Sequence, residues 1–83
     1  MPKGYVIIVR DYVAEICEFQ TIEIFTAPDG TRIYHVLTKY GEDDFKEGEL
    51  KPIRKMLEKE CEELNKALAG AKDARSNSKT VRW

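Results

Sequence analysis

The chain has 83 residues, of which 42% are hydrophobic and 35% are charged, and its formal net charge at pH 7 is -1. This length allows one domain with one modest core, and the hydrophobic content is too high for a disordered chain. The small net charge excludes a strong overall field that would steer the protein to nucleic acid or to a membrane.

The cysteines and the N-terminal segment indicate a cellular compartment. Cys17 and Cys61 can form at most one bridge, unlike the dense framework of a small secreted domain. The apolar run Val6–Val9 is too short for a signal peptide or a membrane span. We therefore expect a cytoplasmic protein with free, buried cysteines, which could meet across the core, and no membrane partner.

The first half of the chain predicts strands. Tyr5–Val9 is β-branched and apolar on both alternating faces, which is typical of a strand covered on both sides. A strand is favoured through most of the stretch 16–26, although Ile16–Phe19 also fits the end of a helical stripe. Ala27–Gly30 predicts a tight turn and hence a β-hairpin whose second arm is Thr31–Tyr40. Alternation along that arm separates Ile33, His35 and Leu37 from Tyr34, Val36 and Thr38.

The second half predicts an acidic connector and one long helix. Residues 42–50 contain five acidic residues and one lysine, and we expect 41–48 to be a polar loop. From near Glu49 an apolar stripe repeats at helical spacing, with Pro52 placed in the first turn. The stripe comprises Leu50, Ile53, Leu57, Cys61, Leu64, Leu68 and Ala71. Its later part also fits a coiled-coil seam, but packing against the sheet is preferred.

The predicted fold is α+β: a three-stranded antiparallel sheet in β-β-β-α order, packed against one long C-terminal helix. Residues 1–75 form the single domain, and 76–83 form a flexible basic tail.

This fold leaves too much apolar surface for one helix to cover. A helix can shelter one face of a three-stranded sheet, so apolar and aromatic side chains remain on the far face unless polar residues dilute them. A second copy of the chain, another protein or the chain's own tail folded back could cover that face; we expect it to bind a protein, with a homodimer favoured. The predicted partner-binding residues are Tyr5, Tyr34, Val36, Glu42, Asp43, Asp44 and Trp83.

The sequence offers little catalytic chemistry. His35 is the only histidine, and no spacing suggests a triad, so a hydrogen-bonded packing role is favoured. The acidic run lacks the ligand spacing of a calcium loop, and the glycines form no phosphate-binding pattern. We therefore expect no catalytic or metal site and no cofactor. The acidic run is best interpreted as solvated, or as a surface that docks on an arginine-rich partner.

The preferred function is a small non-enzymatic protein-binding module that regulates or inhibits a partner by occupying its surface. Its build is similar to that of small regulators encoded by viruses and other mobile elements, an analogy of size and shape alone. The alternative is a nucleic-acid-binding module that uses strand cations and the basic tail. That alternative relies on Arg10, Arg32, Lys39, Lys72, Arg75, Lys79 and Arg82.

Overall fold

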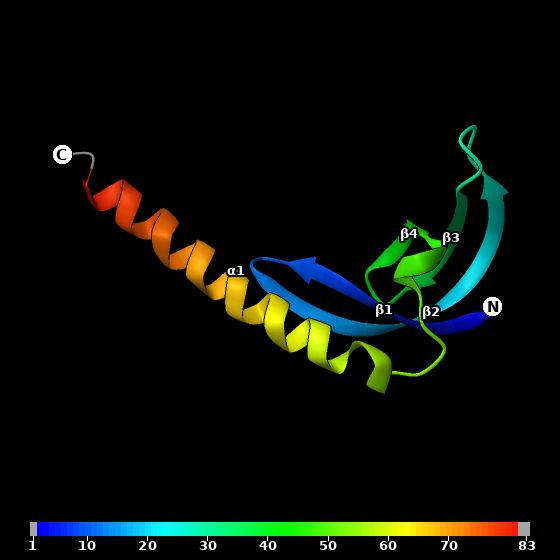
Figure 1. Ribbon diagram of the computed structural model, residues 1–83, viewed down its shortest axis with the longest axis horizontal. Helices are drawn as coiled ribbons and strands as arrows, with labels where there is room; N and C mark the ends of the chain where they lie inside the picture. Colours follow the sequence, from blue (N-terminus) through cyan, green and yellow to red (C-terminus); the bar gives the residue numbers. More distant parts are fainter. Residues whose placement is uncertain (1, 82–83) are drawn as a thin grey trace.

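The computed structural model describes the backbone of residues 2–81 and the side chains of residues 2–72. Its elements are the strands β1 (Lys3–Arg10), β2 (Val13–Thr26), β3 (Arg32–Thr38) and β4 (Gly41–Lys46), the 3-10 helix η1 (Glu47–Glu49) and the helix α1 (Lys55–Val81). The strands form one antiparallel sheet in the order β1-β2-β3-β4, and α1 lies beside it (Figure 1). The α+β prediction is confirmed, but the sheet has four strands and not three.

The additional strand is β4, and the prediction of a polar loop over 41–48 is therefore wrong for its residues. The two-residue turn Lys39–Tyr40 joins it to β3, and Gly41 follows with a φ of 101°, a conformation that favours glycine. The carboxylates of β4 stay exposed because this strand forms an edge of the sheet, and charged side chains are common on edge strands. Its one apolar residue, Phe45, packs against the core.

The predicted hairpin between β2 and β3 is confirmed. The N–H of Ala27 donates to the carbonyl of Thr31 at 2.8 Å, and Asp29 Oδ1 accepts from the N–H of Thr31 at 2.9 Å. Gly30 has the positive φ, 90°, that the turn requires. The strand β2 continues without a helical turn through Ile16–Phe19 and is irregular between Thr21 and Glu23, where a bulge accompanies its bend (Figure 1).

Alternation along the strands gives the sheet two faces, which we call outer and inner. Cross-strand partners share a face, so the register assigns each side chain. The outer face carries Tyr5, Ile7, Ala14, Ile16, Phe25, Ile33, His35 and Leu37. The inner face carries Val6, Phe19, Tyr34 and Val36. The predicted division of the β3 side chains between two faces is therefore confirmed.

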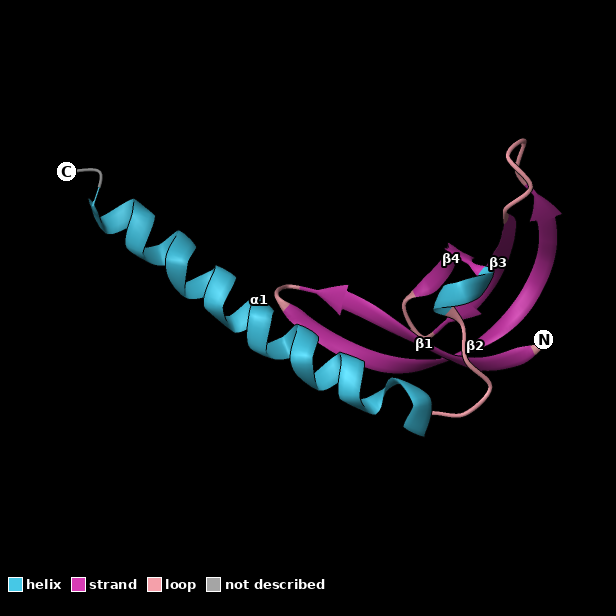
Figure 2. Cartoon of the chain, viewed as in Figure 1, coloured by secondary structure: helices cyan, strands magenta, loops and turns pink. Residues whose placement is uncertain are grey.

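The centre of the inner face is covered by the chain itself. After β4 the chain crosses this face, and η1 lies on the concave side of the curved β2 strand (Figure 2). Leu50 packs into a buried cluster with Val6, Phe19, Tyr34 and Val36. Lys51 then pairs with Tyr5 of β1, with N–H to carbonyl distances of 2.7 and 3.0 Å. The sheet thus curls around a second core that needs no helix.

The helix α1 covers part of the outer face. Leu57 and Cys61 are buried against Ala14 and Ile16, and Leu64 and Leu68 pack at the margin of this cluster. Asn65 fixes the contact: its Oδ1 accepts from the N–H of Ala14 at 2.7 Å and its Nδ2 donates to the carbonyl of Ala14 at 3.0 Å. The covered area is β1 and the first half of β2.

The helix begins later than the sequence predicts. It starts at Lys55, so Pro52 precedes it rather than standing in its first turn. Leu50 belongs to the inner cluster, and Ile53 is exposed. The apolar stripe that meets the sheet therefore begins at Leu57.

Both cysteines are free and buried, as predicted, but they do not meet. Cys61 packs in the outer cluster. Cys17 is the cross-strand partner of Val6 and points to the inner face. In the described part of the chain, no helix combines the length and the apolar character needed to cross a membrane.

Candidate partner-binding surface

The second half of the outer face is uncovered, and we call it the open half. It consists of Phe25, Ile33, His35 and Leu37 on β2 and β3. Phe25 is 43% exposed and Leu37 is 46% exposed. A four-stranded sheet is roughly 15–20 Å wide and a helix about 10 Å, so α1 shelters only about two strands. The open half is therefore the part of the outer face that a second helix would normally cover.

A groove continues the open half toward the start of α1. It has a volume of about 830 Å³ and is lined by residues of β1, β2 and β3 and by Pro52. Tyr5, Gln20 and Leu37 are among its lining residues, and Leu37 also belongs to the open half. Open apolar area and groove thus form one continuous surface.

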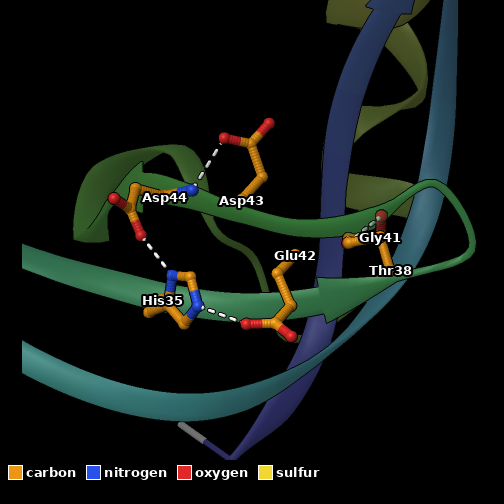
Figure 3. Close-up of polar contacts among 6 residues, drawn as sticks. All are labelled: His35, Thr38, Gly41, Glu42, Asp43 and Asp44. Carbon is orange, nitrogen blue, oxygen red and sulfur yellow. Dashed lines mark hydrogen bonds and ion pairs between the residues drawn. The ribbon is translucent and has the colours of Figure 1, made fainter.

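His35 lies at the centre of the open half and joins two strands. Its Nδ1 is 2.6 Å from Asp44 Oδ1, and its Nε2 is 2.7 Å from Glu42 Oε1, both on β4 (Figure 3). Only the protonated ring can donate from both nitrogens. The hydrogen bonds to Asp44 and then to Glu42 raise the pKa of His35 above its ordinary value. The predicted hydrogen-bonded role of His35 is confirmed.

Charged side chains surround the apolar residues of the open half. Glu23 is the cross-strand partner of His35 on one side and Asp44 on the other, while Glu42 is opposite Leu37. Lys46, opposite Ile33, is the cation on β4. Three carboxylates against one lysine and one histidine give this surface an acidic rim.

Two of the predicted partner-binding residues are not available on the surface. Tyr34 is 3% exposed and Val36 is fully buried, because the crossing after β4 covers the inner face. The Tyr34 hydroxyl donates to Glu47 Oε2 at 3.0 Å. The expectation that these side chains lie on an uncovered face is wrong. A third predicted residue, Tyr5, is half-buried and packs beside the helix cluster.

The remaining predicted residues divide between the open half and the chain end. Glu42 and Asp44 lie beside His35 in the open half. Asp43 alternates to the other side of β4, where its Oδ1 accepts from the N–H of Asp44 at 2.8 Å. Trp83 lies outside the described residues.

Two cations of the alternative function lie together. Arg10 and Lys39 converge on the Tyr40 ring, with their charged groups 4.3 and 5.2 Å from its centroid. Glu15 accepts from the Tyr40 hydroxyl and pairs with Lys39, which lowers the pKa of Glu15.

Two of the other cations have side chains that the structure describes. Arg32 pairs with Glu47 at 3.7 Å, and Lys72 is exposed on α1. The helical backbone includes Arg75 and Lys79, whose side chains are not described, and Arg82 lies outside the described residues.

Phe25, Ile33 and Leu37 are surface residues that the sequence patterns do not predict. The alternation of side chains along β3 is visible in the sequence, and it predicts that Ile33 and Leu37 lie on one face. The pattern does not predict where α1 lies across the width of the sheet, because that position depends on contacts between residues far apart in the chain. The uncovered surface therefore lies on the outer face beside α1, and not on the face of Tyr34 and Val36.

Within the part of the chain that the structure describes, no three His, Cys, Asp or Glu side chains are grouped so as to hold a metal ion.

Comparison with protein families, with characterised proteins and with solved structures found no match to this chain.

Proposed function

We propose that this chain is a small non-enzymatic protein-binding module, which regulates or inhibits a larger protein by docking through its open half. The observation that carries the proposal is the exposure of Phe25 and Leu37 on a sheet face whose other half is covered by α1. Phe25 adjoins Ile33, and Leu37 lies beyond His35 on the same face. Apolar side chains exposed together on one face, with polar residues around them, mark interaction sites.

The size of the surface sets what the partner must supply. Completing the burial of a half-exposed leucine or phenylalanine contributes roughly 1 kcal/mol. Phe25 and Leu37 alone would therefore bind weakly, and the adjoining groove must be filled as well. An apolar ridge about as wide as a helix would cover both, because that is the width of sheet that α1 leaves free.

The charges of the surface favour a basic partner. Glu23, Glu42 and Asp44 surround the apolar centre, and complementary charge at an interface raises the association rate and disfavours wrong partners. The partner that fits is a protein whose helix presents apolar side chains together with lysine or arginine. A non-enzymatic role also fits His35, since both of its ring nitrogens already contact carboxylates.

The proposal is tested by comparing capture of proteins from a lysate by three tagged chains. These are the wild type, Leu37→Glu in the open half, and the matched control Met56→Glu, which replaces a 56% exposed residue on α1. We expect a specific protein to be retained by the wild type and by Met56→Glu and to be lost with Leu37→Glu. Equal capture by all three chains would contradict docking through the open half.

A second candidate, nucleic-acid binding, is favoured by one observation: Arg10 and Lys39 meet at the exposed Tyr40 ring. Cations beside an aromatic ring can hold phosphates and stack on a base. The ion pair of Glu15 with Lys39 weakens this candidate, because the carboxylate offsets part of the positive charge that a phosphate would bind. We expect no shift of DNA or RNA at physiological ionic strength, whereas binding at micromolar or lower concentration would favour this candidate.

A further inference from the structure

The helix α1 is longer than the surface it covers. Among the side chains that the structure describes, Leu68 is the last of the helix in the outer cluster, and every residue from Ala69 to Lys72 is exposed. The helix continues to Val81 and passes beyond the turn between β1 and β2 (Figure 1). We call residues 69–81 the arm.

The dimensions of the arm match those of the open half. At about 1.5 Å per residue the arm is roughly 20 Å long. The strand β3, which runs the length of the open half, is about 23 Å long at 3.3 Å per residue. One helix of this length and of about 10 Å diameter would complete the layer that α1 begins.

The charges of the two segments are opposite. The sequence of 72–83 contains four basic residues and one acidic residue, and the arm includes Lys72, Arg75 and Lys79. The open half is rimmed by Glu23, Glu42 and Asp44. An isolated helical segment of this length gains little stability from its own hydrogen bonds, so packing against a surface would stabilise it.

We propose that, in the absence of another partner, a second copy of this chain occupies the open half with its arm. Each arm lies on the open half of the other copy, which gives a closed dimer with two equivalent contacts. The inference rests on the proposed function, because it names an occupant for the same surface. The larger protein that this module regulates would displace the arm from the open half.

A charge exchange between the two surfaces tests this pairing in the full chain. The first variant, Glu23→Lys with Glu42→Lys, makes the open half basic. The second variant makes the arm acidic by Lys72→Glu, Arg75→Glu and Lys79→Glu. In a mixed dimer both contacts are again complementary, whereas each variant alone pairs like charges.

Sedimentation velocity of the purified proteins measures the oligomeric state of each variant and of the mixture. We expect the wild type to be a dimer, each variant alone to be a monomer, and an equimolar mixture of the two variants to be a dimer. The control Glu60→Lys with Glu63→Lys makes the same charge change on the exposed side of α1 and should remain dimeric.

Three results would overturn the inference: a monomeric wild type, a dimer that persists in both variants, or a mixture that stays monomeric. The lysate comparison with Leu37→Glu is independent of these results. A monomeric wild type that still captures a protein through Leu37 would therefore reject the second copy and retain the proposed function.

Discussion

Tyr34 and Leu37 lie three positions apart on β3 and face opposite sides of the sheet. Tyr34 is buried, and its hydroxyl donates to Glu47, while nearly half of the Leu37 side chain is open to solvent. One side of this strand therefore holds the fold together, and the other is free to bind.

Substitution by a charged residue should separate these two roles. We expect Tyr34→Glu to destabilise the fold by more than about 3 kcal/mol, because it places an unpaired charge in the inner cluster. Leu37→Glu should change stability by about 1 kcal/mol or less, since its side chain reaches water. Urea unfolding followed by circular dichroism measures both. A folded Tyr34→Glu variant of wild-type stability would show that the inner cluster is not a core.

The contact between α1 and the sheet should depend on Leu57. This side chain is 2% exposed, and we expect Leu57→Ala to cost about 2–5 kcal/mol by leaving a cavity. The neighbouring Met56 is exposed, so Met56→Ala should cost less than about 0.5 kcal/mol. Equal unfolding midpoints for the two variants would contradict the packing of α1 against the sheet through Leu57.

Substitution of two glycines by alanine should change the free energy of unfolding in opposite directions. Gly41 has a φ of 101°, so Gly41→Ala should destabilise the turn between β3 and β4 by about 1–2 kcal/mol. Gly70 lies inside α1, and a Cβ added there would meet nothing within 4 Å, so Gly70→Ala should stabilise the helix by up to about 1 kcal/mol. Thermal unfolding of both variants checks the pair, and the same sign for both would contradict the backbone described.

Stability should depend on pH through His35. Its folded pKa lies above the ordinary value of 6.5, because Asp44 and Glu42 bind the protonated ring. The stabilisation is therefore complete below about pH 6.5 and is lost as the pH rises through the folded pKa. Urea midpoints across this range should fall with pH in the wild type. The fall should be much smaller in His35→Gln, and an NMR titration of His35 should give the raised pKa directly.

Sequence patterns were sufficient for the hairpin and for the division of β3 into two faces. Both depend on local properties: the turn chemistry of Pro28, Asp29 and Gly30, and the two-residue period of a strand. The buried state of the cysteines followed from similarly local reasoning.

The strand β4 and the start of α1 were not predictable in this way. The residues of β4 are mostly acidic, and they form a strand because β3 offers a free edge and Lys39–Tyr40 can turn. Leu50 fits the helical stripe by spacing, but the pairing of Lys51 with Tyr5 draws it into the inner cluster. Both outcomes depend on contacts between distant residues, which also decide where the open half lies.

Photocrosslinking from the open half tests the central claim most directly. A photoreactive amino acid replaces Leu37 in one sample and Met56 in another, and each purified chain is irradiated with and without lysate. Docking through the open half predicts covalent adducts, to a second copy or to another protein, from position 37 and few or none from position 56. Adducts from position 56 alone, or in equal yield from both positions, would contradict it.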